Sequence, residues 1–208
     1  MSASRQLELT ASRWAVSMIS LLLVWLISEV PDIYAGDHSR THALLINGGG
    51  NNRINYQSHL LHVKRIHRIL LQAGVPADNI SILSSDGADP GPDLATREVQ
   101  DDANSWLLSG TRLERVLRPS IQYENSLVDG ATLRPATNDS LQQWFEKAEL
   151  ELGPDDVLLL YVTDHGTLNE DNPSNNQITL WGKDENIDVE TLKKLLRRLH
   201  PAAVSYTH

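Results

Sequence analysis

Asp155-Asp-Val-Leu-Leu-Leu-Tyr-Val-Thr-Asp-His-Gly166 joins an apolar run to a polar cluster, and the other elements of the chain can be placed around it. The six residues from Val157 to Val162 carry no charge, which predicts a strand buried on both faces, as in the middle of a parallel sheet. The polar residues that follow are Thr163, Asp164, His165 and Gly166. Because ligands and catalytic groups collect at the carboxyl ends of strands in open α/β sheets, we expect a functional site here.

His165 is the first candidate for chemistry in this cluster. Its imidazole can exchange protons near neutral pH, and Gly166 lets the backbone turn without a side chain that would crowd a substrate. A histidine that merely ends a strand in a turn is the alternative explanation. The segment therefore indicates a site without fixing its reaction.

The composition limits the kind of protein. A chain of 208 residues is long enough for one domain with a sizeable core. The net charge of -9, with no concentrated basic patch, argues against nucleic-acid binding, because Lys and Arg supply most of that affinity. There is no cysteine, and hence no disulfide, cysteine-based zinc site or thiol nucleophile. We expect no cofactor, no metal and no nucleic-acid partner.

Residues 1–35 have the parts of a secretory signal. Arg5 and Arg13 precede an uncharged run from Trp14 to Ser28, and small residues place cleavage after Ala35. An uncleaved N-terminal anchor is the alternative, although the apolar run is shorter than the ~20 residues that span a bilayer. We therefore expect a secreted or periplasmic protein, held at the membrane if the segment is retained.

Strand and helix patterns alternate after this segment. Ala43 to Ile46 and Ile80 to Leu83 are predicted strands, and the amphipathic helix Tyr56 to Ala73 joins them in a right-handed βαβ unit. Further expected elements are a helix at Leu141 to Leu152 capped by Asn138 to Ser140, a helix at Val189 to Leu199 capped by Asp188, and a strand at Ala202 to Tyr206. This order predicts an α/β fold, a three-layer α/β/α sandwich with a mostly parallel sheet.

Three regions allow other interpretations. The loop Asn47-Gly-Gly-Gly50 lacks the ending of a P-loop and the dinucleotide-binding spacing, so we do not expect nucleotide binding. His59 and His62 have a helical spacing that suits a metal, but a solvated helix face that also carries His67 is the more ordinary explanation. Residues 88–138 are rich in turn formers and predict an active-site loop or a disordered insertion.

Motifs between Thr41 and His208 follow a familiar order. They are Asn55-Tyr56, Gly74-Val-Pro before Asn79-Ile-Ser-Ile, Asp86 after the second strand, and Thr163-Asp-His-Gly166. Together they resemble the legumain-type cysteine peptidases of the caspase-like clan. The resemblance implies a caspase-like peptidase domain over residues 41–208. It implies that His165 is the catalytic histidine, that Asn55 helps to orient it, and that Gln57, Asp164 and Gly166 contact the substrate.

Two departures from this family are evident. Its nucleophilic Cys follows the next core strand, here Ala202 to Tyr206, and this chain reaches His208 without one. We expect the chain to be the N-terminal part of a longer one that continues with Cys-x-Ser or Cys-x-Gly. Gln57 stands where legumains have an Arg that helps to recognise asparagine, so that specificity is not expected.

The serines Ser84, Ser85 and Ser205 lack the Gly-x-Ser-x-Gly setting of an activated serine.

The favoured function is an exported cysteine-type endopeptidase that hydrolyses peptide bonds through a Cys-His pair, with the Cys beyond the end of this chain. The imidazole would raise the thiolate fraction and later protonate the leaving amine. The alternative is a non-catalytic caspase-like domain that binds a peptide or protein in the same cleft. A different hydrolase or small-molecule binder is a third possibility, because the fold does not fix the function.

Overall fold

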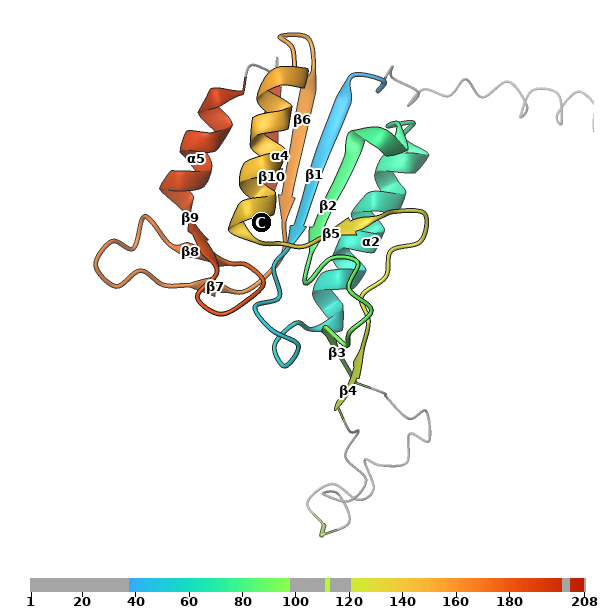
Figure 1. Ribbon diagram of the computed structural model, residues 1–208, viewed down its shortest axis with the longest axis vertical. Helices are drawn as coiled ribbons and strands as arrows, with labels where there is room; N and C mark the ends of the chain where they lie inside the picture. The colour runs from blue at the N-terminus through green and yellow to red at the C-terminus, as the bar shows by residue number, and fades with distance from the viewer. Residues whose placement is uncertain (1–37, 98–110, 113–120, 200–202, 208) are drawn as a thin grey trace, which may run out of the picture. The chain divides into compact units, whose positions relative to one another are not determined.

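The computed structural model describes residues 38–97, 111–112, 121–199 and 203–207. A five-stranded sheet lies at its centre (Figure 1). The strand order is β10-β6-β1-β2-β5, and every pairing in this sheet is parallel. Its strands are β1 (Thr41–Asn47), β2 (Ile80–Ser84), β5 (Leu133–Arg134), β6 (Val157–Val162) and β10 (Ala203–Thr207). The prediction of an α/β fold around a mostly parallel sheet is therefore confirmed.

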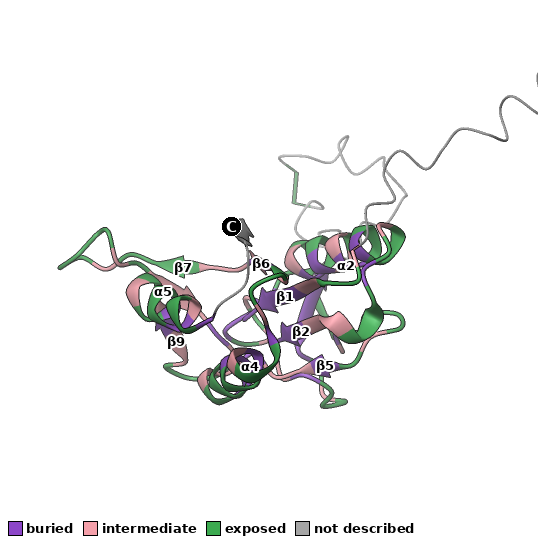
Figure 2. Ribbon diagram, turned by 90° about the horizontal axis from the view of Figure 1, so that it is seen from above, coloured by how far each residue is buried: buried purple, intermediate pink, exposed green. Residues whose placement is uncertain are grey.

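Three of the described helices cover this sheet, and β1 divides the core between them. They are α2 (Gln57–Gln72), α4 (Asn138–Glu151) and α5 (Val189–Arg198). Ala43 and Leu45 of β1 belong to a cluster with α2, whereas Leu44 and Ile46 belong to a cluster with α4 and α5. Since successive side chains of a strand point to opposite faces, the two clusters lie on opposite sides of the sheet. Figure 2 shows α2 and α4 with β1 and β2 between them.

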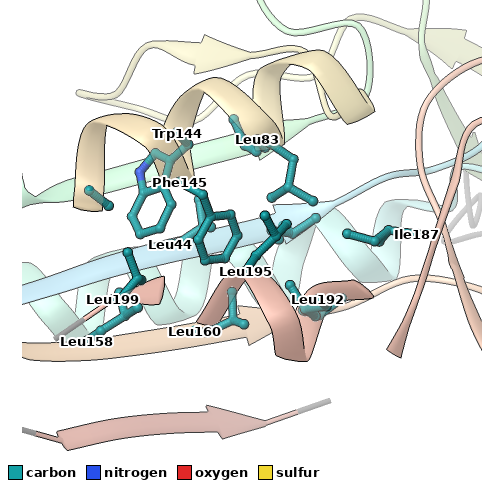
Figure 3. Close-up of a cluster of buried hydrophobic side chains, with 14 of the residues drawn as sticks. Leu44, Leu83, Trp144, Phe145, Leu158, Leu160, Ile187, Leu192, Leu195 and Leu199 are labelled. Atoms are coloured by element: carbon teal, nitrogen blue, oxygen red, sulfur yellow. The ribbon is translucent and has the colours of Figure 1, made fainter. Parts of the chain in front are cut away.

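The cluster under α4 and α5 is the larger of the two (Figure 3). Phe145 and Trp144 of α4 meet edge to face at 5.1 Å between ring centroids. Leu158 and Leu160 of β6 meet them from the sheet. Burial of each such side chain stabilises the fold by about 1.5–3 kcal/mol, so this cluster holds β6 and its carboxyl end in place.

The helix ends follow the chemistry of their sequences. The Asp188 carboxylate accepts a hydrogen bond from the Thr191 amide at the start of α5, as predicted. The start of α4 differs from the prediction, because the Thr137 hydroxyl, and not a residue between 138 and 140, accepts from the Ser140 amide. Gly74 follows α2 with a φ of 86°, a left-handed conformation that glycine adopts without strain.

Residues 88–138 contain more regular structure than the sequence indicated. The described parts form the antiparallel pair β3 (Leu94–Arg97) and β4 (Ile121–Glu124), and β5 extends the central sheet next to β2. The prediction of a loop or disordered insertion is wrong for these segments. Strands this short carry too little periodicity to be recognised in a stretch rich in Pro and Gly.

The burial of β6 also differs from the prediction. Leu158, Leu160 and Val162 are buried, but Leu159 and Tyr161 are half-buried and Val157 is exposed. The strand is therefore fully covered on the α4 and α5 face alone. On the other face the helix α2 lies over β1, which leaves alternate residues of β6 partly open.

Three smaller strands follow β6 and lie next to the candidate site. They are β7 (Gly166–Thr167), β8 (Gln177–Thr179) and β9 (Asn186–Asp188), paired antiparallel. A short 3-10 helix, η1 (Ala77–Asn79), leads into β2. Among the described helices none is long and apolar enough to cross a membrane, and the predicted signal or anchor at residues 1–35 lies outside the described part of the chain.

Candidate active site

His165 lies between β6 and β7, at the carboxyl end of the central sheet. Its Nε2 is 2.9 Å from the carbonyl oxygen of Ile54, in the loop that connects β1 to α2. A carbonyl can only accept a hydrogen bond, so Nε2 carries the proton and Nδ1 keeps its lone pair. The ring is thereby fixed in the tautomer in which Nδ1 can accept a proton.

Two aromatic rings flank the His165 imidazole. Tyr56 meets it edge-on at 5.4 Å between ring centroids, and His59 does so at 5.2 Å. The His59 ring is itself held, because its Nδ1 lies 3.0 Å from the Thr163 hydroxyl. Burial lowers the pKa of His59, with the Asp164 carboxylate opposing that effect, so the neutral ring is favoured at neutral pH.

Asp164 ties the end of β6 to the loop after β1. One carboxylate oxygen accepts a hydrogen bond from the His165 amide at 2.5 Å, and the other accepts from the Gly49 amide. Burial raises the pKa of Asp164, whereas these two hydrogen bonds favour its charged form. The Asp164 carboxylate therefore fixes the backbone at His165 relative to the loop after β1.

The glycines of the loop after β1 are required by close packing. A methyl group on Gly48 would collide with the Thr179 carbonyl and the Asp164 carboxylate. Gly49 has a φ of 74°, and a Cβ there would lie 2.7 Å from the Asn55 side chain. This packing accounts for two of the three consecutive glycines without a bound phosphate.

Asn55 lies at the same end of the sheet, but its side chain is directed away from His165. It is fully buried, and its Nδ2 donates to the Ser85 hydroxyl at 2.7 Å and to the Asp93 carbonyl at 2.8 Å. Its Oδ1 accepts from Asn47 at 3.3 Å. Asn55 therefore joins the ends of β1 and β2, and the group that contacts the His165 ring is the carbonyl of the preceding residue, Ile54.

Three of the predicted site residues line a cavity of about 860 Å³. Asp164, His165 and Gly166 line it, and Gly166 is exposed at the start of β7. Gln57 is exposed at the start of α2 and is not among the described lining residues. The other described residues of the wall are His59, His62, Leu160, Tyr161, Val162, Thr163, Asn176, Gln177, Ile178, Val189, Leu192, Lys193 and Leu196.

Several polar residues have surroundings that the sequence did not indicate. His67 is buried between α2 and the sheet, because it shares the spacing of Leu60, Val63 and Leu70, so the prediction of a solvated histidine face is wrong for this residue. His62 is exposed, in agreement with that prediction. The serines Ser84 and Ser85 are fully buried, which denies a substrate access to their hydroxyls.

Asp86 and Asp93 form a second titratable pair, beyond the end of β2. Burial and the neighbouring Asp93 carboxyl raise the pKa of Asp86 to about 6. Each carboxyl has one buried oxygen that no described residue bonds, Oδ1 of Asp86 and Oδ2 of Asp93. A single shared proton would turn this repulsion into a hydrogen bond, as expected for two adjacent carboxyls.

This pair makes the stability depend on pH. Because the pKa of Asp86 is about 6 in the folded chain and near 3.8 otherwise, the stabilisation from its proton is complete below about pH 3.8 and is lost as the pH rises through 6. We expect Asp86→Asn to raise the free energy of unfolding at pH 7.5 by about 1 kcal/mol, a figure reduced to allow for screening by solvent. Between pH 4 and 7 the free energy of unfolding should fall less steeply in this variant than in the unchanged protein. Urea titrations across this range measure both effects. The exposed Asp78→Asn is the control, and an equal change in both variants would contradict the shared proton.

The donor and acceptor geometry at His165 suits a general base. One nitrogen is held by a main-chain carbonyl, no described residue forms a hydrogen bond with the other, and His165 lines the cavity. The chain matches no protein-family model, and no curated protein matches it. The functional argument therefore rests on the motifs of the sequence and on this geometry.

Proposed function

We propose that this chain supplies the histidine half of a cysteine endopeptidase site of the legumain and caspase-like type. The observation that carries the proposal is the oriented His165 ring at the carboxyl end of β6, with Nε2 bonded to the Ile54 carbonyl and Nδ1 free to take a proton. Acyl transfer of this type requires a nucleophile, a base next to it and a third group that orients the base.

The direction of β10 supports a nucleophile delivered next to this ring. β10 pairs parallel with β6, and Thr207 lies opposite Tyr161. In the same register, the second residue after Thr207 would lie opposite Thr163, two residues before His165. A cysteine at or just beyond that position would approach the imidazole from the neighbouring strand.

The reaction follows from these positions. His165 takes the thiol proton at Nδ1, and the thiolate attacks the peptide carbonyl carbon to form a C–S bond. The protonated imidazole then gives its proton to the leaving amine as the C–N bond breaks. Water attacks the resulting thioester with His165 as base, which releases the acid and restores the thiol. Asp164 and Gly166 line the adjoining cavity, where a substrate chain would lie.

Helices on both faces of a parallel sheet with the strand order β10-β6-β1-β2-β5 support a three-layer caspase-like sandwich. In this proposal Asn55 acts on His165 indirectly, by fixing the loop that carries the Ile54 carbonyl. The signal-like residues 1–35 support an exported enzyme.

The test is to extend the protein through the residues that follow His208 in its native gene product. We expect residues 1–208 to be inactive, and the extended protein to cleave an unstructured polypeptide such as reduced casein. Cleavage should stop when the first downstream cysteine is changed to alanine. An extended protein that binds the polypeptide without cleaving it would favour the alternative, a non-catalytic peptide-binding domain.

A further inference from the structure

Three possible metal ligands converge beside the cavity, from two different elements. His59 comes from the first turn of α2, and Asp164 and His165 come from the end of β6. One ligand atom from each of the three lies within 4.8 Å of the others. Tetrahedral zinc with bonds of about 2.0–2.2 Å sets its ligand atoms ~3.3 Å apart, so small side-chain rotations would complete a site.

Each ligand already has the outer partner that a metal site needs. Metal-binding histidines direct their other ring nitrogen to a carbonyl or another polar oxygen, which fixes the tautomer. His165 does this through Nε2 and the Ile54 carbonyl, and His59 has Nδ1 within 3.0 Å of the Thr163 hydroxyl, which can accept a hydrogen bond when His59 binds a metal through Nε2. The nitrogens left for a metal are then Nδ1 of His165 and Nε2 of His59. Asp164 accepts one backbone amide at each oxygen, so lone pairs remain on both.

The charge balance also favours a cation. Among the described residues no lysine or arginine forms an ion pair with Asp164, although this side chain is half-buried. Among the described residues, the side chains that interact electrostatically with the Asp164 carboxylate are those of His59 and His165. A divalent ion would neutralise the carboxylate and use both free imidazole nitrogens.

We propose that His59, Asp164 and His165 form a binding site for a divalent transition-metal ion of the zinc type. Two imidazoles and one carboxylate suit this class of ion, and three protein ligands beside an open cavity leave a fourth position for water. The site does not depend on the proposed function. If that function also holds, the metal and the reacting proton compete for the same Nδ1 of His165, and the metal inhibits the peptidase.

Calorimetric titration of metal-free protein with ZnCl₂ tests the site directly. The protein is residues 1–208 without a histidine tag. We expect one Zn²⁺ per chain, and at least about 100-fold weaker binding in His59→Gln and in His165→Gln. His42→Gln is the control, because His42 lies in β1, outside both the cluster and the lining of the cavity, and it should bind as the unchanged protein does. Loss of binding in His42→Gln, or full binding in His165→Gln, would overturn the proposal.

A second measurement uses the unchanged protein, so it does not depend on whether the variants fold. Nitrogen-15 NMR of the histidine rings during the zinc titration should shift His165 Nδ1 and His59 Nε2 and leave His42, outside the cluster and the cavity lining, unchanged. No shift at His165 at one equivalent of Zn²⁺ would contradict the site. Zinc binding by residues 1–208 without peptidase activity in the extended protein would sink the proposed function alone, and the reverse pair of results would sink the metal site alone.

Discussion

His165→Ala is expected to lower the kcat/KM of the extended protein for a peptide substrate by at least about 10³-fold. In the proposed mechanism the variant loses both the base that forms the thiolate and the acid that protonates the leaving amine. In His165→Ala the Ile54 carbonyl loses the imidazole that it orients in the unchanged protein. Initial rates at several substrate concentrations measure the effect.

The control for this experiment is another histidine. His42 lies near the amino end of β1, whereas the site lies at the carboxyl end of the sheet. The His42→Ala variant of the extended protein should therefore retain peptidase activity. Circular dichroism of both variants shows whether the fold is kept. Activity that persists without His165 would show that the catalytic assignment is wrong, whatever the fold.

Phe145→Ala is expected to lower the free energy of unfolding by about 3–5 kcal/mol. The side chain is 1% exposed and fills the space between α4 and β6, so its removal leaves a cavity in the cluster that holds β6. Denaturant titration of the two proteins under identical conditions gives the difference.

Leu150→Ala is the matched control, because Leu150 lies on the same helix but is 88% exposed. Its expected effect is within about 0.5 kcal/mol. Similar losses for the two substitutions would contradict the placement of α4 on the sheet, because only one of the two side chains is buried there.

The parts of the fold that the sequence predicted have strong local patterns. The six residues of β6 form an unbroken apolar run, and the predicted bounds match the observed strand. The helix at α2 shows the spacing of Leu60, Val63 and Leu70 and ends before Gly74. Asp188 caps α5 as a residue of its type should. The short strand β5 could not be predicted, since two residues have no periodicity.

The candidate site was predicted only in part, for a physical reason. His165 stands out because an ionisable side chain follows a buried strand. The Ile54 carbonyl, which orients the ring, is a main-chain group and has no signature in the sequence. His59 joins the cluster only because α2 packs beside the end of β6, a long-range contact that no local pattern encodes. The inward direction of the Asn55 amide likewise depends on partners 30 and 38 residues away.

The central claim is that His165 activates a thiol delivered by β10, and the pH dependence of alkylation tests it most directly. In the extended protein, iodoacetamide should modify the downstream cysteine with a midpoint below about pH 7.5, because the imidazole lowers the pKa of the thiol. In His165→Ala the midpoint should move towards about 8.5, the value of a free cysteine. A midpoint near 8.5 in both proteins, or a native continuation that contains no cysteine, would contradict the account.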